Sequence, residues 1–498
     1  MTVSERHAPP GPDGERSLSR RALRWLLVAD GPLKERVMRG GVWLLIGEMA
    51  ARAAGVAKLV ILGRLLSPND FGLMGIGILA LRWADYFTQT GFNIALIQRA
   101  GDIRPYFDTA WTVQVIRGLG LSVLIFLAAP AGAWFFENPE ALPVIQAIGL
   151  VALVRALTNP AVVYLRKDLD FQREVMWRST GVIAGAVVSV LGAIVYPTVW
   201  VLVLGVIVAE AVEAAVSYWM TPYRPHLRFE PARAWALTRI GKWIFFGSLV
   251  EFLALYADSV VVGKVLGATA LGLYVMALQL AMGPSVQIGI HARGVVFPAF
   301  VKLHTGGGLR HAFLRTIRLV ASVVLPVACF LTVFAEPLVR ILLGTQWLSI
   351  VPALRILTWA GAGAGLAGFM TELLTAVGKL ELAVRASLVK VVLLLALLYP
   401  LTTAWGITGA AVALVAATLA ATGTQAFLVS RLIRPTRSEL LVGCRVGLLG
   451  SVPIASAAFL LPGASLAWGV LVGGLAMAMY LAILLLALRL ELWSAGPP

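Results

Sequence analysis

Charged and polar residues interrupt the apolar segments of this sequence, most densely in the first two. Glu48 and Arg52 lie four residues apart in the first segment, so a helix places them on one face within pairing distance. The second segment has polar residues spaced by three and four, which form a stripe along one side of a helix: Arg82, Asp85, Tyr86, Gln89 and Asn93. A charge in a bilayer costs roughly 2.5 to 3.5 kcal/mol, so the stripe needs water or a ligand opposite it. The alternative is that Glu48 with Arg52, and Arg82 with Asp85, are local ion pairs that only hold helices together.

A second group of ionisable residues lies in the middle of the chain. Glu251 and Asp258 are seven residues apart, so they share a helical face, and no cation lies between them. A buried carboxylate without a partner tends to take up a proton, which is the property that a proton-coupled carrier uses. The next segment adds Arg293 as a candidate for ligand binding. Weaker candidates, several of them close enough to a segment end to reach water, are Lys58, Arg117, Arg155, Glu210, Glu213, Glu372 and Lys390.

The composition indicates the environment of these charges. Of 498 residues, 59% are hydrophobic and 13% are charged, and the mean hydropathy is +0.87, which is typical of a chain in a bilayer. The net charge of +16 would also fit a nucleic-acid-binding protein, but the surplus Lys and Arg lie in short stretches between apolar segments. That distribution is the positive-inside pattern, so we expect membrane lipids as partners and no nucleic acid.

Fourteen apolar segments are long enough to cross the hydrocarbon core as helices, which takes about 20 residues each. The sequence therefore predicts an all-α integral membrane protein with about 14 transmembrane helices. Lys and Arg are frequent in alternate loops, whereas the other loops hold only Arg64, Lys264 and Arg340. With residues 1–37 as a basic cytosolic tail, this asymmetry places both termini in the cytosol. The expected segments are 40–62, 71–97, 110–133, 141–164, 175–196, 199–219, 240–263, 270–300, 316–334, 351–377, 380–399, 403–430, 440–461 and 464–488.

Residues 39–73 recur without a gap at 239–273. Eleven positions are identical between the copies, against roughly three or four expected from apolar composition alone. An even number of segments separates the copies, so the halves are predicted to be parallel repeats related about the membrane normal, as in transporters with a central site. The expected organisation is a six-helix lobe at 38–220, a cytosolic linker at 221–238, a second six-helix lobe at 239–430 and two extra helices at 431–498.

Several chemistries are not indicated. The sequence has no Gly-x-x-x-x-Gly-Lys-[Ser/Thr] phosphate loop and no His-Glu-x-x-His pair, and its five histidines do not cluster. Cys329 and Cys444 lie far apart in apolar segments, so neither a disulfide framework nor a metal site is expected. We therefore expect no catalytic residues, no metal and no cofactor, and a secondary carrier rather than an enzyme.

Several motifs resemble one family. The start of Wzx-type polysaccharide or O-antigen repeat-unit flippases is similar to the run Gly63-Arg64-Leu65-Leu66-Ser67-Pro68-Asn69-Asp70-Phe71-Gly72-Leu73 and to Ala95-Leu96-Ile97-Gln98-Arg99. The second copy agrees with the family at Asp258, Val262-Gly263-Lys264, Leu271-Gly272-Leu273-Tyr274 and Phe297-Pro298-Ala299-Phe300. Two loops are also similar to family patterns, Arg166-Lys167-Asp168-Leu169-Asp170-Phe171 and Pro222-Tyr223-Arg224-Pro225. The resemblance covers about residues 38–430.

The resemblance implies a member of the multidrug, oligosaccharidyl-lipid and polysaccharide exporter superfamily, with two six-helix lobes arranged as a V. Such a carrier moves a polyprenyl-pyrophosphate-linked oligosaccharide to the outer leaflet by alternating access, for O-antigen, exopolysaccharide or capsule. It implies the bacterial cytoplasmic (inner) membrane, with a polysaccharide polymerase and co-polymerase as candidate partners. The planar fork of arginine suits pyrophosphate, so we assign head-group binding to Arg52 and Arg82. Around them we expect Glu48, Asp85, Tyr86, Gln89 and Arg293, and for ion coupling Asp258 and Glu251.

Two other functions stay open. A cation or drug antiporter of the same superfamily would present carboxylates and aromatic rings to its substrate, whereas Arg52 and Arg82 favour an anion. A polysaccharide polymerase or ligase handles the same lipid but usually carries a sizeable outer loop, and the longest outer segments here, 134–140 and 335–350, are short. A scaffold without transport would not need the charges inside the membrane.

Overall fold

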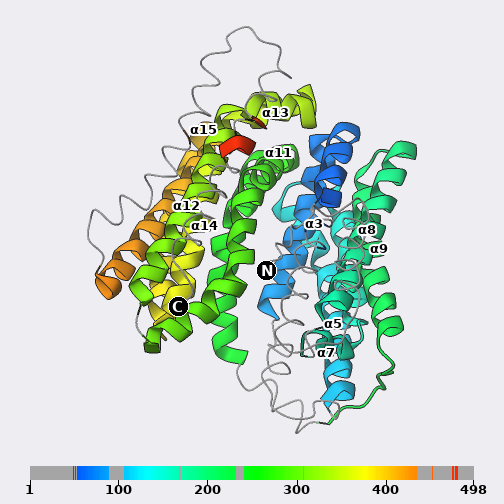
Figure 1. Cartoon of the computed structure of the whole chain (residues 1–498). Helices are drawn as coiled ribbons and strands as arrows, with labels where there is room; N and C mark the ends of the chain where they lie inside the picture. The colour runs from blue at the N-terminus through cyan, green and yellow to red at the C-terminus, as the bar shows by residue number, and fades with distance from the viewer. Residues whose placement is uncertain are drawn as a thin grey trace, which may run out of the picture.

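The described part of this chain is built from helices and contains no strand (Figure 1). The computed structural model describes residues 53–88, 106–167, 170–230, 241–306 and 308–434, together with 47, 49, 51, 451, 474, 475 and 477–480. Within these ranges, the side chains of 166, 167, 171, 241–246, 286–295, 305 and 306 are not described. The predicted all-α fold is confirmed.

The helices form two halves, on the right and on the left of Figure 1. The first half has a helix over 53–65, followed by α3 (Pro68–Phe87), α5 (Phe107–Phe135), α6 (Ala141–Ala156), η2 (Pro160–Val162), α7 (Val163–Lys167), α8 (Phe171–Val195) and α9 (Val199–Met220). The second half has α11 (Gly241–Gly306), α12 (Leu309–Val333), α13 (Ala335–Leu342), η3 (Thr345–Ile350), α14 (Val351–Ala376) and α15 (Leu380–Ile433).

Local signals in the sequence fix where helices begin and bend. A capping box starts α3: the Asp70 N–H donates to the Ser67 hydroxyl at 3.3 Å, and the Ser67 N–H donates to the Asp70 carboxylate at 3.0 Å. Two long elements are broken inside, α11 at Gly267 with φ 84° and α15 at Trp405 and Gly406. A straight α11 of 66 residues would be about 100 Å long, more than three times the hydrocarbon thickness. The breaks therefore make each of α11 and α15 a pair of helices.

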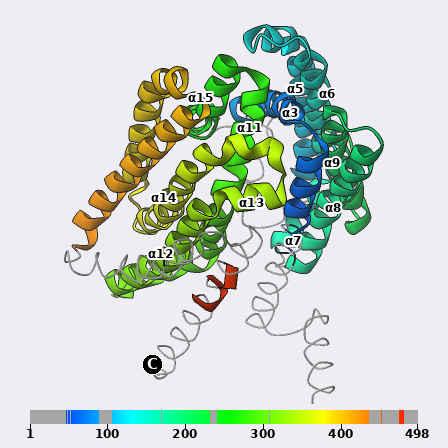
Figure 2. The same ribbon diagram turned by 90° about the horizontal axis from the view of Figure 1, so that it is seen from above.

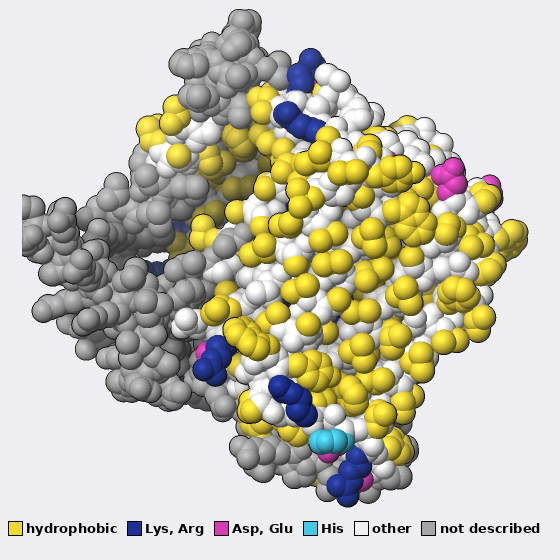
Figure 3. Space-filling view, turned by 90° about the vertical axis from the view of Figure 1, so that its right-hand side faces the viewer, with side chains coloured by type: hydrophobic (Ala, Val, Ile, Leu, Met, Phe, Trp, Pro, Cys, Tyr) yellow, Lys and Arg dark blue, Asp and Glu magenta, His cyan; other side chains and the backbone are white. Residues whose placement is uncertain are grey.

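Seven of the described helices are long and apolar enough to cross a membrane, namely α5, α8, α9, α11, α12, α14 and α15. In α5, α8 and α9 only 28% to 33% of the most apolar stretch is buried within the protein. Hydrophobic side chains cover the face of the first half in Figure 3, as a surface in contact with lipid requires. These observations confirm a multi-pass membrane protein. The number fourteen stays a prediction, because segments 440–461 and 464–488 lie almost wholly outside the described residues.

The two copies of the repeat meet at one close contact. A Cβ added to Gly72 of α3 would lie 1.8 Å from the Ala268 carbonyl oxygen of α11, and a Cβ added to Gly272 would lie 1.9 Å from the Pro68 carbonyl oxygen. Positions 68 and 268, and 72 and 272, correspond under the 200-residue offset, so the contact is symmetric. Only glycine allows the backbones to approach this closely. The views in Figures 1 and 2 agree that α3 and α11 lie side by side where the halves meet.

Polar contacts also join the halves at the end of the molecule where α13 lies, at the top of Figure 1, called the α13 end below. The Arg64 Nε–H donates to the last carbonyl of α13 at 3.1 Å, and the Trp347 indole N–H donates to the Gly63 carbonyl at 2.6 Å. From the other half, the Lys264 ammonium contacts the Glu137 carboxylate at 2.7 Å. Each half thus contacts the first helix of the other half, namely the 53–65 helix and the first part of α11. These contacts close the molecule at the α13 end.

Acid is expected to weaken the Lys264–Glu137 contact. The hydrogen bond from Lys264 lowers the pKa of the exposed Glu137 carboxyl, which lies between α5 and α6. Because the carboxyl pKa is lowered, the contact contributes its full stabilisation above the ordinary carboxyl pKa of about 4. This stabilisation is lost as the pH falls through the lowered pKa. Spin labels at positions 140 and 269, one on each half, should show a wider distance distribution at acid pH. The same response in Glu137→Gln would contradict this assignment.

Candidate functional site

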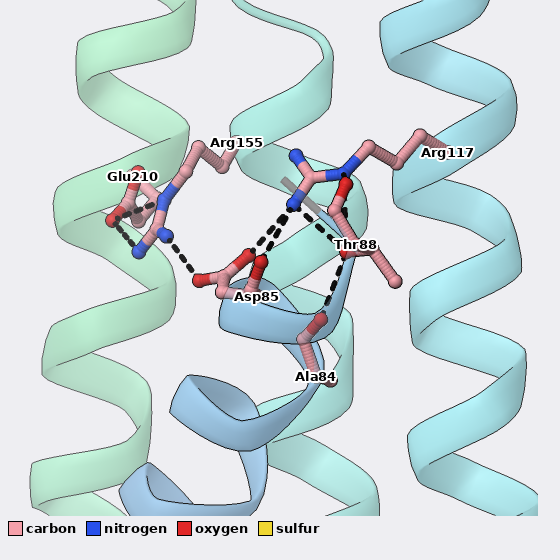
Figure 4. A network of polar contacts seen from close by, with 6 residues as sticks. All are labelled: Ala84, Asp85, Thr88, Arg117, Arg155 and Glu210. Atoms are coloured by element: carbon pink, nitrogen blue, oxygen red, sulfur yellow. Dashed lines mark hydrogen bonds and ion pairs between the residues drawn. The ribbon is translucent and has the colours of Figure 1, made fainter. Parts of the chain in front are cut away.

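Four charged side chains from four helices meet inside the first half (Figure 4). Asp85 of α3 forms ion pairs with Arg117 of α5 at 3.5 Å and with Arg155 of α6 at 3.0 Å. Arg155 also donates to one oxygen of Glu210 on α9, from Nη2 at 2.7 Å and from Nε at 3.1 Å. Their side chains are only 18% to 38% exposed, so each charge depends on its protein partners. The network ties α3 to α5, α6 and α9.

Arg117 also forms hydrogen bonds to the C-terminal end of α3. Its Nε–H donates to the Thr88 carbonyl at 2.8 Å, and the Thr88 hydroxyl donates to the Ala84 carbonyl at 2.8 Å. A cation beside the last carbonyls of a helix opposes their partial negative charge. Arg117 is therefore a structural residue of the network.

Arg82 does not join this network. The alternative interpretation, a local ion pair between Arg82 and Asp85, is not what the structure shows, because Arg117 and Arg155 from other helices pair with that carboxylate. Neighbours in the tertiary structure thus compete with neighbours along a helix. Arg82 is half-buried, and it forms no hydrogen bond or ion pair within the part of the chain that the structure describes. A guanidinium without a carboxylate is available to bind an anion.

Aromatic rings from both halves meet around Tyr86, which follows Arg82 by four residues of α3. The Tyr86 ring lies 6.1 Å from Phe252 and 6.0 Å from Tyr256 of α11, measured between ring centroids. Phe87 lies 6.2 Å from Phe252, and the two α11 rings are 5.5 Å apart. These rings form a group at the boundary between the halves, where a planar or ring-shaped ligand finds apolar faces and the Tyr86 and Tyr256 hydroxyls.

Glu251 of α11 belongs to the same boundary. Its side chain is exposed, and the charges of Glu251 and Arg82 both act on the Tyr86 hydroxyl. Three predicted site residues, Arg82, Tyr86 and Glu251, are thus brought together from two halves of the chain. We call this set, with Phe252 and Tyr256, the boundary site.

Asp258 is in a different environment from Glu251, although both belong to α11. It is 2% exposed, and its carboxylate accepts the Tyr274 hydroxyl at 2.8 Å and the Ser259 N–H at 2.7 Å. Lys390 of α15 is close enough to interact electrostatically with it. The cation that acts on Asp258 thus comes from another helix, which spacing along one segment does not reveal. Its role in ion coupling stays a prediction.

The remaining predicted site residues are not placed by the structure. Glu48, Arg52 and Gln89 lie outside the described residues. For Arg293 the structure describes the backbone but not the side chain. They stay predictions. Among the described residues no group of three or more His, Cys, Asp or Glu could hold a metal ion.

Sequence reasoning ranked Arg117, Arg155 and Glu210 too low. A signal was present: Arg117 follows the start of α5 by ten residues and Glu210 precedes the end of α9 by ten, so they lie at a similar depth. Spacing along the chain does not reveal which helices are neighbours, and the pairing therefore became visible only in the fold.

Asp85→Ala is expected to lower the thermal stability of the first half. The change leaves Arg117 and Arg155 near each other without the carboxylate between them, which costs up to roughly 3 to 5 kcal/mol in a buried pair and less where solvent screens it. Denaturation of the purified protein in detergent measures the effect. Glu336→Ala is the control, because that carboxylate pairs with Arg340 at an exposed site, with side chains 46% and 43% exposed. Equal melting temperatures for the two variants would contradict a structural role for the network.

A many-span helical chain whose repeated halves meet around charged and aromatic residues has the architecture of a membrane transporter. Solved structures share this fold. Lipid II flippase MurJ in an inward closed conformation matches with a TM-score of 0.74 and 12% identity, over 90% of this chain and 100% of that chain. An inward-facing multidrug resistance MATE family transporter matches with a TM-score of 0.61 and 17% identity, over 79% of this chain and 98% of that chain.

The polysaccharide biosynthesis protein family matches residues 61–352, more than half of the sequence. The chain belongs to this family. The lipopolysaccharide biosynthesis protein WzxC of Escherichia coli (strain K12) is 25% identical over 361 residues, 72% of this chain and 73% of the relative. The teichuronic acid biosynthesis protein TuaB of Bacillus subtilis (strain 168) is 25% identical over 364 residues, 70% of this chain and 73% of the relative. These relatives confirm the resemblance to Wzx-type flippases, and family and fold agree with a protein that is not an enzyme.

Proposed function

We propose that this protein moves polyprenyl-pyrophosphate-linked oligosaccharide repeat units from the cytosolic to the outer leaflet of the bacterial cytoplasmic membrane, for surface polysaccharide assembly. The observation that carries the proposal is Arg82: a half-buried cation without a partner among the described residues, beside aromatic rings at the boundary of two halves. A relative whose name refers to polysaccharide transport supports the substrate class: the succinoglycan biosynthesis transport protein ExoT of Rhizobium meliloti (strain 1021) is 24% identical over 323 residues.

The chemistry of the boundary site suits both parts of such a head group. Pyrophosphate carries charge that a guanidinium binds through two parallel hydrogen bonds. Sugar rings have apolar faces that pack on Tyr86, Phe252 and Tyr256, and hydroxyls that bond to the Glu251 carboxylate. The polyprenyl tail needs no protein site because it stays in the bilayer. We further propose that both termini lie in the cytosol, that the α13 end faces outward, and that a polymerase and co-polymerase act on the product.

Deletion of the gene in its host tests this function. The surface polymer should disappear, and a polyprenyl-pyrophosphate oligosaccharide should accumulate on the cytosolic leaflet, where sugar-modifying reagents cannot reach it in intact cells. Extraction and mass spectrometry of that lipid also identify the sugars. An unchanged lipid profile with an unchanged polymer would rule the proposal out.

A second function has one observation in its favour. Glu251 is exposed beside the Tyr86 and Tyr256 rings, which is a combination that binds an organic cation. A drug antiporter of the same fold would therefore use the same boundary site. New sensitivity of the deletion strain to cationic dyes, with a normal polymer, would favour this reading over the flippase.

We also propose that transport is coupled to an ion gradient through Asp258, with Glu251 as the exposed carboxylate of the same helix. Asp258→Asn removes a charge that accepts the Tyr274 hydroxyl and interacts electrostatically with Lys390, and flipping in reconstituted vesicles should then no longer respond to an imposed pH or sodium gradient. Glu336→Gln, at an exposed ion pair, is the control. A gradient response equal to that of the wild-type protein would remove Asp258 from the coupling mechanism.

A further inference from the structure

A cavity of about 660 Å³ lies at the end of the first half that is opposite α13, called the α7 end below. Its walls come from the start of α5, from α7, from the start of α8 and from the residues that follow α9. The volume is within the range of small-molecule binding pockets, which is about 300 to 1,000 Å³. None of the residues assigned above to transport lines this cavity.

The cavity brings together two motifs that the family resemblance singled out. One is the 166–171 motif, of which Asp170 lines the cavity, and the other is the 222–225 motif, which contributes Tyr223. The ring of Phe107 lies between the two sides, with its centroid 5.4 Å from Tyr164 and 5.2 Å from Tyr223. Segments more than fifty residues apart in sequence therefore form one aromatic-walled site.

A buried asparagine holds these walls in place. Asn159 is fully buried, and its side-chain N–H donates to the Tyr223 carbonyl at 2.8 Å while its side-chain oxygen accepts the Ala161 N–H at 3.0 Å. Its own backbone N–H donates to the Ser217 hydroxyl at 2.9 Å. These bonds link α9, η2 and the loop after α9. The cavity is thus preorganised, which lowers the entropic cost of binding a ligand.

The Tyr223 hydroxyl is fixed as well. It donates to the Asp108 carboxylate, which also accepts the His226 backbone N–H at 2.8 Å. Burial, together with this hydrogen bond, raises the pKa of the Tyr223 hydroxyl. The ring therefore stays neutral at physiological pH and keeps one orientation.

The lining has little net charge. Asp170 and Arg173 form an ion pair at 3.4 Å, with side chains 37% and 65% exposed. Because the two charges of this pair cancel, the cavity has no free cation for a phosphate group among its described lining residues, whereas the boundary site has Arg82. Aromatic walls with a carboxylate, a guanidinium and the Thr221 hydroxyl instead suit a neutral ring that carries many hydroxyl groups.

The position of the cavity fits a ligand that extends from the network region. Phe107, in the cavity wall, precedes Arg117 of the charged network by ten residues of α5, which is about 15 Å. Along α9, Glu210 of the network precedes Met220 of the wall by the same ten residues. Along the helix axes, the cavity thus lies about 15 Å from the depth of the network.

We propose that this cavity is a separate sugar-binding subsite, which takes neutral sugar residues of the lipid-linked oligosaccharide that lie away from the pyrophosphate. The subsite rests on the proposed function. It gives selectivity for the glycan, whereas Arg82 binds the phosphate part that all such lipids share.

Binding measurements with two probes test the subsite. The full chain is purified and titrated with the oligosaccharide-bearing polyprenyl lipid extracted from the deletion strain, and separately with polyprenyl pyrophosphate without sugars. Arg173→Ala and Tyr164→Ala should bind the oligosaccharide lipid roughly tenfold more weakly, because each removes a hydrogen-bonding or packing partner of the sugar, and should bind polyprenyl pyrophosphate as the wild type does. Arg82→Ala should weaken the binding of both probes.

Arg228→Ala and Phe229→Ala are the matched controls. They remove the same kinds of side chain from the exposed segment after the 222–225 motif, where Arg228 pairs with Glu230 and Phe229 is 54% exposed. Tyr164→Phe removes only the hydroxyl and keeps the packing of the ring on Phe107. Comparison of this variant with Tyr164→Ala therefore separates weaker binding caused by the missing hydroxyl from weaker binding caused by misfolding. Unchanged affinity of Arg173→Ala and Tyr164→Ala for the oligosaccharide lipid would overturn the subsite and leave the proposed function intact. No binding of either probe to the wild-type protein would overturn both.

Discussion

Arg82→Ala is expected to stop production of the surface polymer while folded protein remains in the membrane. No described carboxylate pairs with Arg82, so its removal leaves no unpaired charge behind and should change the melting temperature little. The loss falls on the ligand: a bidentate contact to a phosphate group corresponds to roughly tenfold to a hundredfold in affinity. Transport of the lipid-linked oligosaccharide in vesicles, with membrane protein quantified alongside, measures both effects.

Arg82→Lys separates charge from geometry. Lysine keeps the positive charge but lacks the planar fork of donors, so we expect partial activity. Arg385→Ala, which removes an exposed arginine from α15, should leave transport unchanged. A normal polymer in Arg82→Ala would remove Arg82 from the boundary site.

Gly72→Val is expected to prevent closure of the α13 end. Even the first carbon of any side chain at this position would lie 1.8 Å from a backbone oxygen of the other half, and a backbone atom cannot move aside as a flexible side chain can. The halves must therefore separate. The alternating access that the family resemblance implies needs this end to close in each cycle, so transport should fall by roughly tenfold or more.

Cross-linking between the halves reports this closure directly. The side chains of Asn69 and Thr269 lie 3.4 Å apart, so cysteines at these positions should react with a short bifunctional thiol reagent in a chain without Cys329 and Cys444. The yield should drop in Gly72→Val. Gly120→Val is the control, since a Cβ added to Gly120 of α5 meets nothing within 4 Å. Equal yields in both variants would show that the Gly72 contact does not control the approach of the halves.

The repeat has kept its backbone contacts but not its charges. When the 200-residue offset is continued beyond residue 73, Asp85, which anchors the charged network of the first half, corresponds to Ser285, which is fully buried. Asp258, the buried carboxylate of the second half, corresponds to Lys58, a half-buried residue of opposite charge. The two halves therefore differ in the charges that they hold at corresponding positions.

The sequence by itself determined the helical membrane fold, the repeat and the family. A bilayer leaves a long apolar segment with one main way to satisfy its backbone, which is the helix, so length and hydropathy suffice. It also placed Arg82, Tyr86 and Glu251 in the candidate site, and the fold does bring them to one boundary. Whether they bind the substrate stays a prediction.

Only the tertiary structure decided which charges are partners. Helical spacing relates residues three and four apart, so it indicated a possible pair of Arg82 with Asp85 and no partner for Asp258. In the fold, Asp85 pairs instead with Arg117 and Arg155. The cavity at the α7 end was equally hidden from the sequence, because its walls come from segments that are distant in sequence. The physical reason is the same in both cases: the rotation and packing of one helix against another set these contacts, and no periodicity within a single helix encodes them.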